Sequence, residues 1–128
     1  VIDVRGAQQI DERSIETLHL QAGDIVLFYT GIGDQFGTEP YYTSHPTLTP
    51  QLAELLVQKG ISIVGLDTPS PDVDPFPVHK ILLEKEVLII ENLTNLESLL
   101  SYETFTVYAL PLNIEADASP VRVIASIG

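Results

Sequence analysis

The hydrophobic pattern of the chain predicts a series of buried strands. Residues 25–29 and 87–90 are unbroken apolar runs of strand length, and residues 61–66 form a third, largely apolar run. Unbroken runs are typical of strands covered on both faces, whereas alternation marks half-exposed strands. Residues 1–4 give a shorter strand signal. Residues 105–110 alternate and end at a proline, and residues 121–127 form the last predicted strand.

Helical spacing separates these runs. Leu52, Leu55 and Leu56 share one helical face, with Thr49 as N-cap, Pro50 in the first turn and Gly60 as a left-handed end. Residues 78–86 regain helical spacing, whereas residues 11–20 are weakly helical and residues 95–100 form a short helix or turn. Strand, helix and strand with short joints predict an α/β fold.

The remaining segments are predicted loops. Residues 30–37 contain three glycines, but the third glycine of a dinucleotide fingerprint is absent, so a plain loop is favoured over a phosphate loop. We expect this loop to continue through Tyr41 and Tyr42 to His45, which we predict to be exposed. Residues 67–77 hold four prolines and several carboxylates, so they can be neither helix nor central strand.

Composition narrows the class of protein. The chain has 128 residues, no cysteine and a net charge of −12. Its length predicts one domain, residues 1–128, and its charge argues against nucleic acids and anionic membranes as partners. The absence of cysteine, of a long apolar stretch and of a signal peptide suits a cytoplasmic protein. Since residues 1–4 begin within a strand and no methionine occurs, we expect a fragment of a longer chain.

His79 and Glu91 are the strongest candidates for chemistry. Glu91 ends an apolar run, where a carboxylate must be paired, metal-bound or already in solvent. His79 begins a predicted helix twelve residues earlier, and helix plus returning strand would bring the two within reach. Both side chains suit Zn²⁺ or Mn²⁺. Two ligands do not complete a metal site, however, so from these residues alone a structural histidine is the favoured interpretation.

The sequence gives weaker support for other kinds of catalytic site. No serine lies in a nucleophile elbow. A carboxylate dyad from Asp67, Asp72 and Asp74 is conceivable, but acids in a proline-rich loop are more often turn formers that bond their own backbone.

Several motifs in order resemble those of the cyclase family, the kynurenine formamidase-like metal-dependent hydrolases. They are Gly23-Asp-Ile-Val-Leu27 followed by Tyr29-Thr-Gly31, Gly65-Leu-Asp-Thr-Pro-Ser70, Val78-His-Lys-x-Leu-Leu83, Ile89-Ile-Glu-Asn-Leu-Thr-Asn-Leu96, Leu110-Pro-Leu112 and Asp117-Ala-Ser-Pro-Val-Arg122. The resemblance covers nearly the whole chain. It implies a swivelling β/β/α domain, usually oligomeric, that hydrolyses amide or related bonds with zinc or manganese.

The resemblance also implies roles for particular residues. His79 and Glu91 would be metal ligands, and Asp67 and Ser70 would lie on a loop near the active site. The family's main metal motif, His-x-Gly-Thr-His-x-Asp, and its catalytic histidine lie upstream of the part that this chain matches. The chain would thus be the C-terminal portion, with no catalytic residue of its own, inactive alone, and completed by an upstream segment of the same or a second chain.

Two functions follow from this reading. The favoured one is a metal-dependent hydrolase of small-molecule amides or cyclic amides, assembled as a homo-oligomer. The alternative is a non-catalytic binding or assembly module that retains the fold.

Overall fold

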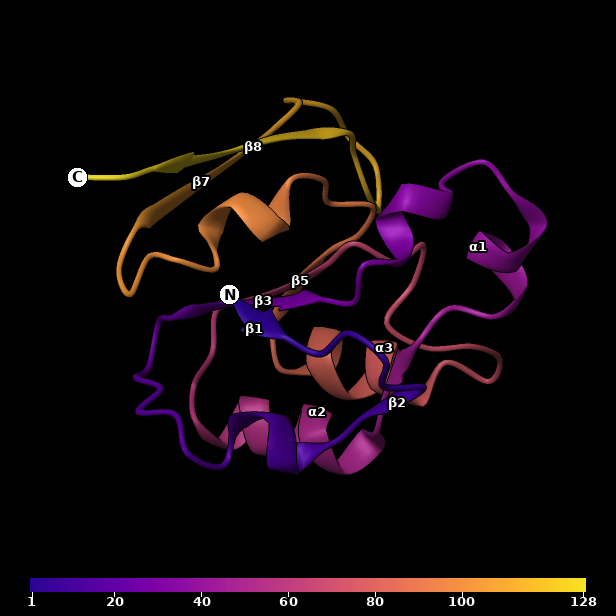
Figure 1. Cartoon of the computed structure of the whole chain (residues 1–128), viewed down its shortest axis with the longest axis horizontal. Helices are drawn as coiled ribbons and strands as arrows, with labels where there is room; N and C mark the ends of the chain where they lie inside the picture. The colour runs from indigo at the N-terminus through magenta and orange to yellow at the C-terminus, as the bar shows by residue number, and fades with distance from the viewer.

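A four-stranded parallel sheet forms the centre of the molecule (Figure 1). The computed structural model describes residues 1–128. The strands are β1 (Ile2–Asp3), β3 (Ile25–Tyr29), β5 (Ile63–Leu66) and β6 (Leu88–Ile90), hydrogen-bonded in the order β1-β3-β5-β6. Every pairing is parallel, so the carboxyl ends of all four strands lie along one edge of the sheet.

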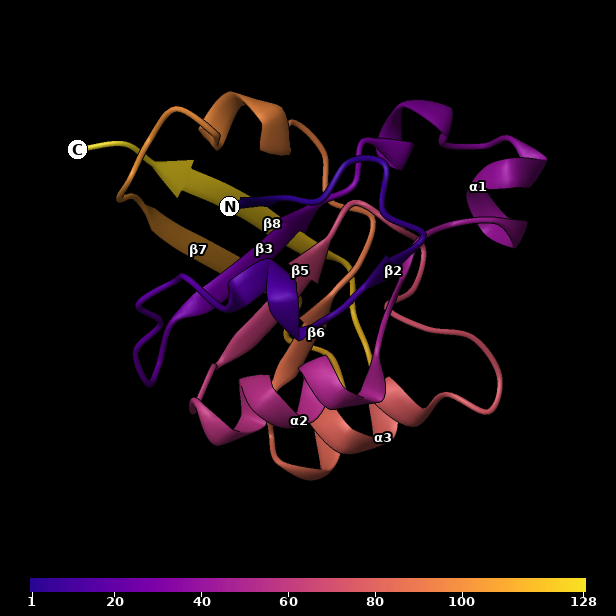
Figure 2. The ribbon, with the colours of Figure 1, turned by 60° about the horizontal axis from the view of Figure 1, so that its bottom comes forward.

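Helices α2 (Pro50–Gln58) and α3 (Pro77–Glu84) cover one face of this sheet (Figure 2). They pack against each other, and the 3₁₀ helix η1 (Glu12–Ile15) lies against α2. The larger hydrophobic core lies between these helices and the sheet. Alternate strand residues such as Val26, Phe28 and Val64 contribute to it. The prediction of strand, helix and strand is therefore confirmed.

A two-stranded antiparallel hairpin covers the opposite face (Figure 1). It is formed by β7 (Thr106–Pro111) and β8 (Val121–Ser126), and the 3₁₀ helix η3 (Leu96–Leu99) lies on the same side. The inward residues of the hairpin pack on a second core around Leu27 and Ile90. Hairpin, sheet and helices make three layers, which is the β/β/α arrangement that the family resemblance implies.

Gly65 allows the segment after β6 to pack closely against β5 on the hairpin side of the sheet. A Cβ atom at this position would lie 2.5 Å from Leu27 Cδ2 and 2.7 Å from Leu93 Cδ1. Leu93 in turn donates its backbone N–H to Leu66 O. The missing side chain therefore lets the segment after β6 lie directly over β5.

Local sequence signals account for α2. The Thr49 hydroxyl accepts from Leu52 N–H, Pro50 occupies the first turn, and Gly60 adopts φ 71° after the helix end. Leu52 and Leu56 are fully buried. The predicted helix at 78–86 corresponds to α3, and residues 95–100 form η3.

Two expectations from the sequence were wrong in detail. The segment after β3 is not a plain loop, because it contains the 3₁₀ helix η2 (Ile32–Gln35), the short helix α1 (Glu39–Thr43) and β4 (Thr47–Leu48), which pairs with β2 (Gln9–Ile10). Within residues 11–20, only η1 is helical. A Glu-Pro start with tyrosines carries little helical periodicity, so α1 depends on tertiary packing, chiefly the burial of Tyr41.

No helix has the length and apolar character needed to cross a membrane.

The outward face of the hairpin exposes apolar side chains. Tyr108 and Ile124 lie opposite each other across the two strands, and Leu110 lies beyond them; each is about half exposed.

Candidate metal centre

The candidate residues gather at the carboxyl edge of the parallel sheet. Thr30, Asp67 and Glu91 each follow the last residue of a strand, β3, β5 and β6 respectively. Loops at this edge are where α/β proteins commonly place ligand sites.

His79 and Glu91 meet at this edge. His79 is the third residue of α3, and its Nε2 atom lies 3.4 Å from Glu91 Oε1. The His79 side chain is 27% exposed and that of Glu91 33% exposed, so both can be reached from solvent. Folding therefore brings the two sequence-predicted candidates face to face.

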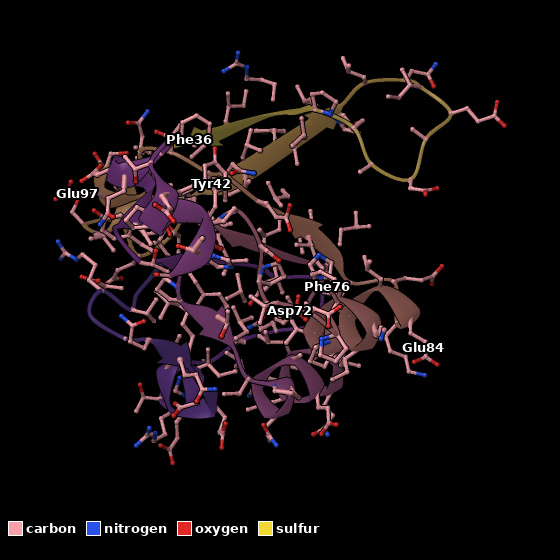
Figure 3. All side chains as sticks on the ribbon, turned by 90° about the vertical axis from the view of Figure 1, so that its right-hand side faces the viewer. Phe36, Tyr42, Asp72, Phe76, Glu84 and Glu97 are labelled. Atoms are coloured by element: carbon pink, nitrogen blue, oxygen red, sulfur yellow. The ribbon has the colours of Figure 1, made fainter.

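Asp72 bonds the second ring nitrogen of His79, Nδ1. Its Oδ1 atom lies 2.5 Å from His79 Nδ1, and its Oδ2 atom accepts the backbone N–H groups of Val78 (2.6 Å) and His79 (3.3 Å). The Asp72 side chain is only 5% exposed. A carboxylate at the N-terminus of a helix satisfies free N–H groups and is favoured by the helix dipole. Figure 3 shows Asp72 beside Phe76 at the start of α3, with Glu84 at its far end.

The hydrogen bonds of Asp72 fix the proton on His79. An ionised carboxylate only accepts, so His79 Nδ1 must carry a hydrogen and donate it to Asp72. In a neutral ring, Nε2 is then an acceptor, and it faces the acceptor oxygen of Glu91. Two acceptors in this arrangement require a proton or a metal cation between them.

The donor set fits a divalent metal. A ligating histidine commonly donates its second ring N–H to a carboxylate, as His79 does to Asp72. Ligand atoms at about 2.0–2.2 Å from one tetrahedral zinc lie roughly 3.3–3.6 Å apart, in the range of the His79–Glu91 separation. The chain contains no group of three or more His, Cys, Asp or Glu side chains that could hold a metal. His79 and Glu91 are thus two candidate ligands, with the Asp72 carboxylate bonded to the far side of the His79 ring.

Glu91 lies in an environment that disfavours its charge. Burial raises the pKa of the Glu91 carboxyl, and His79 opposes this shift. A cavity of about 390 Å³ opens beside Glu91, between the segment that follows β6 and the inner face of β8. Cavities of this size are typical of small-molecule sites.

Asp67 is tied to the adjacent strand. Its buried carboxylate accepts Thr30 N–H (2.9 Å), Thr30 Oγ1–H (2.7 Å) and Gly31 N–H (2.8 Å). Asp67 thus joins the ends of β5 and β3 and leaves little capacity for a ligand. Its neighbour Thr68 accepts Asn92 N–H at 2.9 Å, which places this loop beside the residue after Glu91.

Ser70 shapes the proline-rich loop. Its hydroxyl donates to Asp72 O at 2.6 Å and accepts Asp72 N–H at 3.3 Å, while its carbonyl accepts the Thr68 hydroxyl at 2.7 Å. Ser70 therefore fixes the backbone of Asp72, the residue that orients His79.

The prediction that His45 is exposed was wrong. The residue is half-buried, and neither ring nitrogen has solvent contact or a hydrogen-bond partner. His19, by contrast, is exposed.

Tyr41 buries its ring, and its hydroxyl donates to Asn92 Oδ1 at 2.7 Å. This bond draws the end of α1 toward the end of β6.

Sequence reasoning missed the role of Asp72. It was grouped with Asp67 and Asp74 as a turn former, because an acid among prolines commonly bonds its own loop. A usable signal was present. An acid a few residues before Pro77 at the start of a helix is a candidate cap, although its contact with the His79 ring requires the folded loop.

Three comparisons relate the chain to known proteins. The Cyclase family model, described as "Putative cyclase", matches residues 1–73. An uncharacterized protein of Methanocaldococcus jannaschii is 40% identical over 83% of this chain and 55% of its own length. The kynurenine formamidase of Bacillus mycoides is 31% identical over 97% of this chain and 59% of its own length. The chain thus spans between half and two thirds of the length of these relatives.

Solved structures share the fold. A protein described as a "potential metal-dependent hydrolase with cyclase activity" superimposes with a TM-score of 0.78 at 28% identity, over 94% of this chain and 60% of that one. An isatin hydrolase bound to thioisatinate gives a TM-score of 0.83 over 98% of this chain and 58% of that one. At 24% identity, the second likeness shows the fold alone.

Proposed function

The chain belongs to the cyclase family, and on that premise we propose that it forms part of a metal-dependent hydrolase of amide or cyclic amide bonds. His79 and Glu91 supply part of the metal site. The names of the similar proteins, a kynurenine formamidase and a metal-dependent hydrolase, support this class of reaction. The substrate is a small molecule with an amide or formamide group.

The face-to-face arrangement of His79 Nε2 and Glu91 Oε1 carries the proposal. The two acceptor atoms are 3.4 Å apart, and Asp72 accepts the single ring N–H of a neutral His79. A divalent cation between them relieves the repulsion of the two acceptors. It also favours the ionised form of Glu91, whose pKa is raised by burial.

Each residue of the chain then has a stated role. His79 and Glu91 hold Zn²⁺ or Mn²⁺, Asp72 orients the His79 ring, and Asp67 and Ser70 brace the loops that carry these groups. When bound, the metal activates water and polarises the amide carbonyl. The cavity beside Glu91 accommodates the substrate.

The remaining ligands and the catalytic acid/base come from an upstream segment of the same or a second polypeptide. Two ligands are fewer than the three that a catalytic zinc generally takes from protein. The half-exposed Tyr108, Leu110 and Ile124 of the hairpin provide an apolar surface for such a segment or for a further copy in a homo-oligomer. We accordingly expect this chain alone to be inactive.

Substitution of the two ligands tests the proposal. In the natively assembled protein, His79→Ala and Glu91→Ala should each lower metal content and amide hydrolysis by 10-fold or more, while far-ultraviolet circular dichroism stays unchanged. The matched controls are His19→Ala and Glu84→Ala, which alter exposed side chains of the same types. Full metal content and turnover in both ligand variants would overturn the metal assignment.

Intact mass and metal analysis of the natively purified protein separates the hydrolase from its alternative. A mass above 14.0 kDa together with bound zinc or manganese supports the hydrolase. A mass matching this chain, with no metal, favours the non-catalytic binding or assembly module. That second function is consistent with the absence of a three-donor metal group in this chain.

A further inference from the structure

His45 has two buried ring nitrogens that nothing in the chain satisfies. Neither Nδ1 nor Nε2 has contact with solvent or a hydrogen-bond partner. Most buried polar side chains are hydrogen-bonded, since leaving one unpaired costs free energy. An enclosed imidazole without partners therefore points to a contact that forms when the site is complete.

Two contacts fix the place of His45. Four residues before it, Tyr41 donates its hydroxyl to Asn92 Oδ1 at 2.7 Å. Three residues after it, Leu48 donates its backbone N–H to Pro71 O at 2.8 Å. One anchor is adjacent in sequence to Glu91 and the other to Asp72. The His45 segment thus bridges the two loops that carry the candidate metal centre.

The segment that contains His45 is joined to the stretch that carries Glu91. The hydrogen bond from Tyr41 reaches Asn92, the residue directly after Glu91. The only hydrogen-bonding contact of the Glu91 side chain lies toward His79, which leaves its other oxygen without a protein donor.

A comparison within the site shows what Glu91 lacks. His79 is oriented by Asp72, which accepts its Nδ1–H. Ligating carboxylates are likewise held by hydrogen bonds from groups around them. His45 has ring nitrogens without a partner, and it does not complete a three-donor metal group with His79 and Glu91. A supporting role accordingly fits it better than direct ligation.

We propose that His45 is a positioning residue for Glu91, donating a ring N–H to the carboxylate oxygen that does not face His79. This inference rests on the proposed function, because it assigns His45 to the metal site built by His79 and Glu91. The contact would hold the carboxylate in a single orientation. Less side-chain conformational entropy would then be lost when metal binds.

The test compares His45→Ala, His45→Gln and His19→Ala in the natively assembled protein. Zn²⁺ and Mn²⁺ affinities are measured by competition with a chelating dye, and thermal unfolding of the metal-free protein is recorded in parallel. We expect His45→Ala to weaken metal binding about 10-fold or more, with little change in the metal-free unfolding temperature. His45→Gln retains an N–H donor and should recover most of the affinity. His19→Ala, at an exposed histidine, should match the unchanged protein.

Three results would overturn the inference. Unchanged metal affinity with a lower unfolding temperature in His45→Ala would make His45 structural. Unchanged affinity with a raised KM would make it a substrate contact. Equal losses in the alanine and glutamine variants would exclude hydrogen bonding as the cause. If His79→Ala also retained full metal affinity, the proposed function itself would fail, and not only the role of His45.

Discussion

Asp72 and His79 form one unit at the start of α3, because Asp72 accepts His79 Nδ1–H at 2.5 Å through one oxygen and the backbone N–H groups of Val78 and His79 through the other. The same buried carboxylate therefore begins the helix and sets the ring of its third residue. Helix formation and the orientation of the candidate ligand depend on a single side chain.

Asp72→Asn should weaken both functions of this carboxylate. An amide can still accept one N–H, but it loses the charge that favours the helix N-terminus and presents an NH₂ group to one of its donors. We expect metal affinity to fall about 10- to 100-fold and the free energy of unfolding to fall by about 1–2 kcal/mol. Metal titration and urea unfolding measure the two effects. Asp74→Asn, an exposed acid of the same loop, is the matched control and should change neither.

Asp67→Asn should destabilise the sheet edge more strongly. Asp67 accepts three hydrogens from Thr30 and Gly31, and an amide would turn its NH₂ group toward at least one of these donors. We expect a loss of roughly 3 kcal/mol in the free energy of unfolding, because buried donors are left unpaired. Asp34→Asn changes an exposed acid nearby and should have little effect. Equal stability of the two variants in urea unfolding would contradict the stabilising role of the Asp67 hydrogen bonds.

Gly65→Ala should disturb the second core and the loop after β6. The new Cβ atom would lie 2.5 Å from Leu27 Cδ2 and 2.7 Å from Leu93 Cδ1, so one of these leucines must move. Overpacking of this kind typically costs about 1–3 kcal/mol. Since Leu93 lies two residues after Glu91, metal affinity should fall as well. Gly33→Ala is the control, because its nearest contact would be an ordinary 3.4 Å from Asp67 Cβ.

Tyr41 gives a pH-dependent prediction. Burial, aided by the negative charge of Asp67, raises the pKa of Tyr41 from 10.0 to about 12. A raised pKa means that folding favours the neutral phenol, so this stabilisation is complete below pH 10 and is lost as pH rises toward 12. Tyr41→Phe should lack this loss and should remove the most alkaline step from a spectroscopic tyrosine titration.

At neutral pH, Tyr41→Phe should cost about 1 kcal/mol, the net value of one hydrogen bond. Asn92 is exposed and can bond water instead, which limits the loss. Tyr42→Phe is the control, since the Tyr42 ring is 53% exposed. Figure 3 labels Tyr42 with Phe36 on the η2–α1 segment that projects from the molecule. Loss of the alkaline step in Tyr42→Phe, and not in Tyr41→Phe, would contradict the assignment.

Local signals in the sequence determined most of the framework. The unbroken apolar run at β3 and the Thr49, Pro50 and Gly60 signals around α2 depend on neighbours along the chain, so they could be read without the fold. The succession of these elements indicated α/β architecture. The residues His79 and Glu91, one helix and one strand apart, were candidates from the sequence, and the resemblance to the cyclase family singled them out as the pair that meets at the sheet edge.

Only the tertiary structure decided how the site is supported. The contact of Asp72 with the His79 ring, the closure of Asp67 on Thr30, and the enclosure of His45 all join residues from different elements. Helix α1 is bonded to the segment after β6 through Tyr41 and Asn92, which are 51 residues apart in the sequence. Such contacts leave no periodicity in the sequence, since their free energy arises only when distant segments pack together. The sequence therefore identified the candidate ligands, and the fold identified the groups that hold them.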